Sequence, residues 1–203
     1  MITKRHALYR QIRGSVLHVT WIGGLEGTLR DQAIRPNPDH FLDHSASFCS
    51  SSLYACQKLG GVSLLDFKSA DERDLFDPQR IQHWSGVFSS YHPAIALVLS
   101  YSAVQGQLVP WSVLRTMPEK SLLGEACHRG TIPLSAVTDG IVVGAAYRVI
   151  YSSPDLYSVL SRARQVDRFS RRRRSDIFSL FQDRNIEQGA ARNSHRAGQV
   201  TGL

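Results

Sequence analysis

Cysteine is scarce in this chain of 203 residues, which contains only Cys49, Cys56 and Cys127. An odd number this small does not make a disulfide framework, so we expect three reduced thiols in a cytoplasmic protein. No run approaches the roughly 18–20 apolar residues that a membrane-spanning helix needs. Residues 1–8 carry charge and lack the apolar stretch of a secretory signal. These absences predict a protein with no membrane partner.

Three widespread motifs are missing as well. The sequence has no Walker A motif, no GxGxxG and no GxSxG, which removes the standard P-loop, dinucleotide-fold and hydrolase-elbow interpretations. Residues 37–60 do contain side chains that bind zinc, but without the CxxC spacing of a zinc site. We therefore expect a polar loop and no metal, with zinc as the less favoured alternative. These side chains are Asp39, His40, Asp43, His44, Cys49 and Cys56.

Positive charge is concentrated near the C-terminus. The formal net charge is +7, of which residues 162–174 hold +6, residues 175–203 hold none and residues 1–161 hold +1. Arginine forks suit phosphate groups, so this basic segment predicts contact with nucleic acid or another polyanion. The alternative is a solvated helix face. The arginines are Arg162, Arg164, Arg168, Arg171, Arg172, Arg173 and Arg174.

Apolar and β-branched runs predict strands at 16–20, 62–65, 94–101, 122–128 and 140–151. Trp21, Leu25 and Leu29 recur at helical spacing, and the prolines after Arg35 end that helix. Further helical segments are expected at 51–59, 110–117 and 131–137. A last helix begins at Ser153-Pro154 and runs into the arginines.

Strict alternation of strands and helices is absent, so the pattern favours an α+β fold with a split, mixed β-sheet and flanking helices. A hydrophobic content of 42% is enough for one core at this length. We expect a folded domain over 1–155, a basic helical segment over 156–188 and a disordered tail over 189–203.

Two strands carry candidate functional residues. His18 and Thr20 alternate along the first strand and share a face, where they could hold two ligand hydroxyls. Glu125 lies in an otherwise apolar strand, and glutamate is rarely buried unless it is paired or functional. A core histidine and a glutamate on the wet face of an edge strand are the structural alternatives.

A glycine pair at 60–61 precedes a third candidate group. Glycine allows close approach of a ligand, and Ser63, Asp66 and Phe67 could then offer polar and stacking contacts. A tight turn into a strand explains the same glycines without any ligand.

The order of these segments resembles a known family. Val16–Thr20 followed by Gly24–Ile34 resembles the opening of ADP-ribosyltransferase-fold proteins, in which a His-x-Thr strand precedes a helix. Gln32 or Ala33 stands where that family usually has glycine. Gly124–Val137 resembles the family's closing phrase, a catalytic glutamate followed by glycine and Ile-Pro. Across residues 8–150 the sequence is similar to DarT-type DNA ADP-ribosyltransferase toxins, except at 62–67, where those proteins are rich in aromatic residues.

The resemblance implies an NAD-dependent ADP-ribosyltransferase that acts as a bacterial toxin or defence effector, with NAD as substrate. Glu125 would stabilise the positive charge that builds on the ribose when the nicotinamide bond breaks. His18 would anchor a ribose hydroxyl with support from Thr20. Because one ligand must touch both, we expect His18 and Glu125 to face the same cleft.

The remaining roles also follow from the resemblance. Ser63 would brace the pocket, Phe67 or Tyr54 would stack on nicotinamide, and residues 110–123 would recognise the acceptor. That acceptor would be nucleic acid, which the arginines favour, or protein, and a cognate antitoxin would be a further partner.

Two other functions fit parts of the sequence. An RNA 2′-phosphotransferase would share the fold and use NAD, but it relies on pocket arginines for which we find no match. A non-catalytic nucleic-acid-binding module would work through residues 162–174 alone. NAD consumption separates this module from the transferase.

Overall fold

The computed structural model describes residues 2–36, 55–69, 85–88, 93–117 and 124–170. The chain divides into two compact units, residues 1–164 and 165–203. The first unit holds every strand of the described residues, and the described part of the second is helical. Residues 37–54 and 171–203 lie outside the described residues. The polar loop, Arg171–Arg174 and the predicted tail therefore stay predictions.

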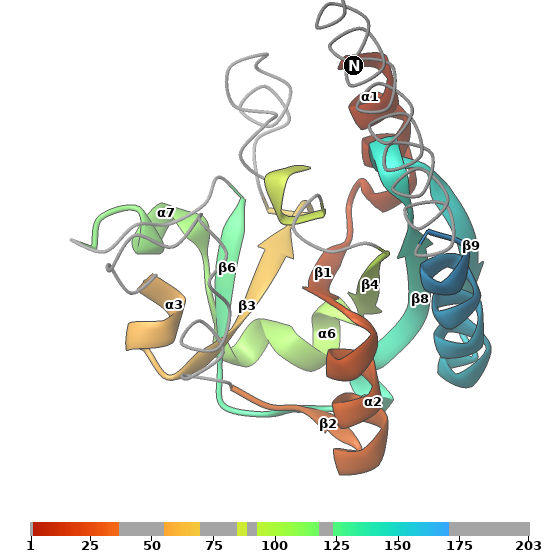
Figure 1. The fold of residues 1–203 in the computed structure, drawn as a ribbon. Coiled ribbons are helices and arrows are strands. Elements are labelled where there is room, and N and C mark those ends of the chain that lie inside the picture. Colours follow the sequence, from red (N-terminus) through yellow and green to blue (C-terminus); the bar gives the residue numbers. More distant parts are fainter. Residues whose placement is uncertain (1, 37–54, 70–84, 89–92, 118–123, 171–203) are drawn as a thin grey trace, which may run out of the picture. The chain divides into compact units, whose positions relative to one another are not determined.

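Seven strands form one sheet in the order β5-β6-β3-β1-β4-β8-β9 (Figure 1). The predicted α+β class is confirmed, but each strand pair in the described residues is antiparallel, so a mixed sheet is the wrong description. The strands are β1 (Val16–Thr20), β3 (Gly61–Asp66), β4 (Ala94–Leu99), β5 (Leu108–Val109), β6 (Glu125–Arg129), β8 (Val137–Val143) and β9 (Val149–Ser153).

The helices are short apart from the first two and the last. Their bounds are α1 (Ile2–Ile12), α2 (Ile22–Asp31), α3 (Ala55–Lys58), α6 (Tyr101–Val104) and α7 (Trp111–Leu114), with further helical residues at 85–88 and 156–170. None of the helices in the described residues is both long and apolar enough to span a membrane.

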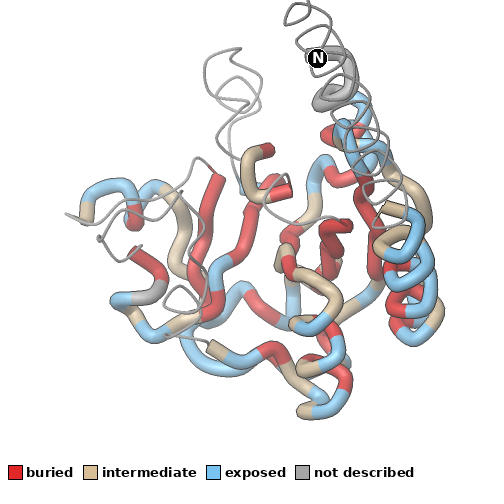
Figure 2. The backbone as a smooth tube through the Cα atoms, viewed as in Figure 1, coloured by how far each residue is buried: buried red, intermediate tan, exposed pale blue. Residues whose placement is uncertain are grey.

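Side chains on both faces of the sheet are buried. Figure 2 shows that buried residues predominate along the central strands. On one face, Leu8 and Ile12 of α1 join a core with Leu17 and Ile141. Gly140 precedes Ile141 in β8, so its position belongs to the opposite face of the sheet. A Cβ at Gly140 would lie 2.8 Å from Leu156 and 2.9 Å from Val159, so helical residues 156–164 pack closely on this second face.

A separate two-stranded ladder joins two segments that are far apart in the sequence. β2 (Ala33–Ile34) pairs with β7 (Ile132–Pro133), so Ile34 lies opposite Ile132. The predicted helical turn at 131–137 is therefore wrong at its start, since its first residues are strand and the helical turn is Leu134–Ala136. Gln32, with φ of 52°, takes the left-handed backbone that favours glycine.

The predicted strand over 140–151 is two strands, β8 and β9, joined by a tight turn. Ala146 and Tyr147 both have positive φ, 57° and 63°, as type I′ hairpin turns require. The usual residues of such turns are Asn and Gly, and neither occupies these two positions. An apolar run without that turn signal looks like one long strand.

We expect Ala146→Asn to stabilise the protein because asparagine tolerates the left-handed backbone that costs alanine about 1 kcal/mol. The melting temperature should rise by roughly 2–4 °C, as a gain of that size gives in a chain of this length. The matched control is Ala145→Asn, which changes the preceding residue, whose φ is not positive. Equal melting temperatures for Ala146→Asn and the control would contradict the strain argument.

The helical residues 156–170 begin after an Asp155 N-cap, as the predicted start at Ser153-Pro154 implied. Asp155 Oδ1 accepts the backbone N–H of Tyr157, and Oδ2 accepts the hydroxyl of Ser158. The Ser158 hydroxyl, with the backbone N–H groups of Tyr157 and Ser158, lowers the pKa of Asp155 below its ordinary value.

This cap makes stability depend on pH. A carboxylate whose pKa falls on folding stabilises the protein above its unfolded pKa, and that contribution disappears as the pH drops through the folded pKa. Asp155→Ala should lower the melting temperature at pH 7 by roughly 2–4 °C. Asp155→Asn keeps an N-cap that does not titrate. The gap between wild type and Asp155→Ala should shrink below about pH 4 in thermal melts, and a constant gap would contradict the assignment.

Candidate functional site

Glu125 is the first residue of β6 and is almost fully buried, with 2% of its surface exposed. The wet face of an edge strand is therefore excluded, because β5 and β3 flank β6 and the side chain lies inside. A carboxylate in this position needs partners that replace water. Its burial makes Glu125 the centre of the candidate site.

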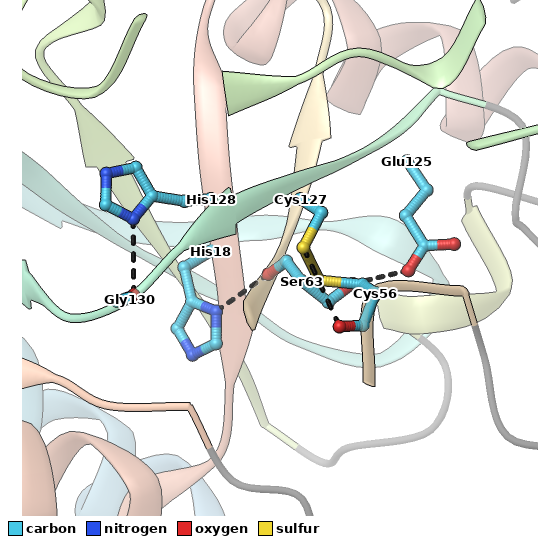
Figure 3. Close-up of a disulfide and its surroundings, with 7 residues drawn as sticks. All are labelled: His18, Cys56, Ser63, Glu125, Cys127, His128 and Gly130. Atoms are coloured by element: carbon cyan, nitrogen blue, oxygen red, sulfur yellow. Dashed lines mark hydrogen bonds between the residues drawn. A yellow bond between two sulfur atoms is a disulfide. The ribbon is translucent and has the colours of Figure 1, made fainter. Parts of the chain in front are cut away.

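Ser63 of β3 supplies one such partner. Its Oγ donates a hydrogen bond to Glu125 Oε1 at 2.9 Å (Figure 3). Ser63 lies opposite Cys127 in the β3–β6 ladder, and Leu65 lies opposite Glu125. The serine is thus the diagonal neighbour of the glutamate on one face of the sheet. This contact fits the bracing role predicted for Ser63.

His18 joins the same group from β1. Its Nδ1 lies 3.0 Å from the carbonyl oxygen of Ser63 (Figure 3). A carbonyl only accepts, so Nδ1 carries the proton, and in the neutral ring Nε2 is then an acceptor. Ser63 therefore links the two predicted catalytic residues, through its carbonyl to His18 and through its hydroxyl to Glu125.

The break between β1 and β3 explains how His18 reaches Ser63. The ladder between these strands has only two pairs, Val16 with Asp66 and Leu17 with Leu65. Regular alternation would place Leu17, Leu65 and Glu125 on one face and His18 on the other. His18 comes directly after Leu17, the last β1 residue that pairs with β3, and its ring bonds to the carbonyl of Ser63 on β3. β1 stays regularly paired with β4 through Thr20, with His18 opposite Leu97, so the register does not bring His18 and Glu125 to one face. Their shared cleft stays a prediction.

Thr20 is buried at the end of β1. A Cβ on Gly24 would overlap the Thr20 hydroxyl, so α2 can start this close to the strand only because residue 24 is glycine. The Oγ1 of Thr28 donates to the carbonyl of Gly24 in the same turn. This packing fixes the direction in which β1 leaves the site and is compatible with the supporting role predicted for Thr20.

The two aromatic residues predicted to stack on nicotinamide have different outcomes. Phe67 is 3% exposed and packs edge-on against Tyr9, with ring centroids 5.8 Å apart, inside the main core. Its ring is used for packing, so we leave it out of the ligand site. Tyr54 lies outside the described residues.

The expectation of three reduced thiols is wrong for two of them. Cys56 of α3 and Cys127 of β6 form a disulfide with their Cα atoms 5.2 Å apart (Figure 3). A Cβ on Gly61 would overlap Cys127 Sγ, so this glycine makes room for the sulfur atoms. This pairing was not predicted from the sequence, although the glycine pair at 60–61 was a candidate feature. Cysteine separation alone, here 71 residues, does not reveal a pairing.

The acceptor segment predicted at 110–123 is described only as far as residue 117. Its helix α7 has Pro110 as N-cap and buries Leu114 beside Cys56 and Cys127. Arg115 lies over the Trp111 ring, 5.1 Å from its centroid. A guanidinium stacked on indole offers a flat, positively charged surface next to the strand that carries Glu125.

The predicted basic segment has three arginines in the described residues. Arg162, Arg164 and Arg168 are all exposed. Arg164 is also paired with a carboxylate of α2, since its Nη2 and Nε lie 2.6 and 3.2 Å from Glu26 Oε1. An exposed pair of this kind is worth little to stability, but it reduces the positive charge that Arg164 offers to a ligand.

A metal centre finds no support in the described residues, where no group of three or more His, Cys, Asp and Glu side chains could hold an ion. The weaker zinc hypothesis, apart from Cys56, rested on residues 39–49, which lie outside the described residues. Cys56 itself is bonded to Cys127.

Comparisons with known proteins return nothing for this chain. No protein-family model matches the sequence, and neither a curated protein nor a solved structure matches it. The case for a function therefore rests on the residues that meet where β1, β3 and β6 run side by side, namely His18, Ser63 and Glu125.

Proposed function

We propose that this chain is an NAD-dependent ADP-ribosyltransferase with Glu125 as its catalytic carboxylate. The observation that carries the proposal is the hydrogen-bonded series from His18 through Ser63 to Glu125. Residues separated by more than a hundred positions meet on three adjacent strands, in the combination that the family resemblance implies. Glutamate is rarely buried unless it is paired or functional, so the burial of Glu125 supports the proposal.

The chemistry proposed for Glu125 follows from its charge and burial. Breaking the bond between nicotinamide and ribose sends the electron pair to nicotinamide and leaves an oxocarbenium-like positive charge on the ribose. A carboxylate held in a site of low dielectric stabilises that charge without first having to reorganise. The acceptor nucleophile then forms the new bond at the ribose carbon, and its proton passes to a base or to water.

Ser63 is a positioning residue in this proposal. Its hydroxyl donates to one carboxylate oxygen of Glu125 and so fixes the rotamer of the carboxylate. His18 is held through Nδ1, which directs Nε2 to a ribose hydroxyl. Thr20 is buried against Gly24 at the end of β1 and acts indirectly, by holding the strand that carries His18.

The family-level fold is part of the same proposal. Supporting observations are the break between β1 and β3 after two residue pairs and the ladder of β2 with β7. That ladder joins the two segments that resemble the opening and the closing phrase of the family. Gln32, rather than Ala33, takes the left-handed backbone and so corresponds to the family's usual glycine.

The direct test is incubation of the purified chain with NAD labelled in its adenylate half. Released nicotinamide measures cleavage of the glycosidic bond, and label on added single-stranded DNA, RNA or protein identifies the acceptor class. We expect nicotinamide release above the background rate, and label on nucleic acid. A folded chain that neither releases nicotinamide nor transfers label would contradict the proposal.

A further inference from the structure

The disulfide and the candidate carboxylate share one strand and one face. Cys127 lies two residues beyond Glu125 in β6, and alternation puts both side chains on the same side. Cys127 is also the register partner of Ser63, whose hydroxyl binds Glu125. Any shift of Cys127 along or away from β3 therefore acts on the Ser63–Glu125 hydrogen bond.

The disulfide links α3 covalently to β6, in addition to the chain connection between α3 and β3. α3 has only four residues, and so short a helix has almost no stability of its own. A turn at Gly60, with φ of 63°, connects it to β3. The bond crosses Gly61 to reach β6, and both sulfur atoms are buried with Ala55 and Leu114. The position of α3 thus depends on the disulfide and a small apolar cluster.

We propose that Cys56–Cys127 is a redox control site for the active site proposed above. In the oxidised chain the bond holds α3 against β6 and keeps Ser63 and Glu125 together. Reduction releases α3, loosens the β3–β6 pair and lowers the activity. The claim about activity rests on the proposed function, whereas the claim about strand order does not.

The reaction balances with a dithiol as reductant. One thiolate of the dithiol attacks a cysteine sulfur, the S–S bond breaks, and a mixed disulfide forms. The second thiol of the reagent then attacks the mixed disulfide and releases the protein cysteine, so the reagent leaves as a cyclic disulfide. Two electrons and two protons reach the protein, which then carries two thiols. Because both sulfur atoms are buried, α3 must open before the attack, and the reduction rate reports that opening.

The reduced state already has a place for the new thiol. Cys127 Sγ lies 3.7 Å from the carbonyl oxygen of Cys56, within reach of a weak S–H···O hydrogen bond (Figure 3). Reduction therefore leaves no unpaired polar group on Cys127 in this cluster. A site that accepts both states supports reversible control rather than a permanent staple.

The experiment uses the full chain with Cys49→Ser, so that only one cysteine pair remains. Three samples are compared: oxidised, reduced with dithiothreitol, and oxidant-treated with Cys56→Ser and Cys127→Ser added. Alkylation and mass spectrometry count the thiols, and amide hydrogen exchange follows residues 61–66 and 125–129 against those of β4 and β8. We expect exchange in β3 and β6 to be about tenfold faster in the last two samples, with β4 and β8 unchanged.

Nicotinamide release from NAD is measured on the same samples. It should fall about tenfold on reduction, as loss of positioning predicts, and recover on reoxidation, while the double serine variant stays low. Equal exchange in oxidised and reduced chains would overturn the proposal. Faster exchange across the whole sheet would overturn it too, because the disulfide would then stabilise the entire fold and not this strand pair. If no sample cleaves NAD but exchange changes only in β3 and β6, the transferase fails and the redox control of this strand pair stands.

Discussion

Glu125→Gln should lower nicotinamide release from NAD by about a hundred- to a thousandfold, the usual cost of removing one preorganised electrostatic group. Glutamine keeps the size of the side chain and still accepts the hydrogen bond from Ser63. The substitution therefore removes the charge that stabilises the oxocarbenium-like ribose and keeps the contact with Ser63. Initial rates at saturating NAD, with circular dichroism to verify the fold, measure the effect.

A matched control removes a carboxylate of the same type elsewhere. Glu26→Gln on α2 deletes an exposed charge that pairs with Arg164, whereas Glu125 is buried and pairs with Ser63. It should leave nicotinamide release at the wild-type level. The rate of nicotinamide release by Ser63→Ala should lie between those of Glu125→Gln and Glu26→Gln, because this variant frees the rotamer of Glu125 without removing its charge. Wild-type turnover in a folded Glu125→Gln chain would refute the catalytic assignment.

The sheet was predictable from the sequence wherever its strands are strongly apolar. β1, β3 and β4 appear within a residue or two of the expected ranges. The helix after β1 also forms, despite Gly23, Gly24 and Gly27, because Leu25 and Leu29 are buried along its inner face. Burial of a helix face outweighs the cost of glycine, about 1 kcal/mol per residue.

The missed elements lacked a strong local signal. α1 depends on Leu8, Tyr9 and Ile12, three apolar residues among polar ones, which gain their burial only from the sheet. β2 and β7 have two residues each and exist because they pair with each other. The hairpin at Ala146 and Tyr147 uses residues that turns of its type disfavour. In all three cases tertiary contacts decide what local preference leaves open.

The candidate site was predictable as a set of residues but not as an arrangement. His18, Ser63 and Glu125 were expected to act together, and hydrogen bonds through Ser63 connect them. That the ring of His18 binds a backbone carbonyl depends on where the β1–β3 ladder ends, which no strand pattern reveals. Phe67 was assigned to the ligand because an aromatic residue next to a candidate site looks the same in sequence whether it stacks or packs.

Nucleic-acid binding by residues 162–174 should depend steeply on salt. Each phosphate neutralised on a single strand contributes a slope of about −0.7 in log affinity against log salt. About four contacts would give a slope near −3, which is roughly a fiftyfold loss of affinity between 50 and 200 mM salt. Titrations of a labelled single-stranded oligonucleotide at several salt concentrations give this slope directly.

Replacing Arg171–Arg174 with alanine should flatten the slope, while nicotinamide release without an acceptor continues at the wild-type rate. The helix that leads into these arginines packs through Leu156, Val159 and Ala163, none of which is changed. The fold of residues 1–164 should therefore survive. Identical slopes for wild type and the quadruple variant would mean that the segment is a solvated face.

Glu26 provides a second, opposite test of the same interface. Its Oε1 accepts a hydrogen bond from Arg164 Nη2 at 2.6 Å, so part of the charge of this arginine is already neutralised in the free protein. Glu26→Gln releases Arg164 for a phosphate and should steepen the slope by up to about 0.7. If the segment is a solvated face, neither variant changes the slope. If phosphate contacts are confined to Arg171–Arg174, replacing these arginines flattens the slope and Glu26→Gln leaves it unchanged. The two variants together therefore distinguish a phosphate-binding surface that includes Arg164 from one confined to the four consecutive arginines.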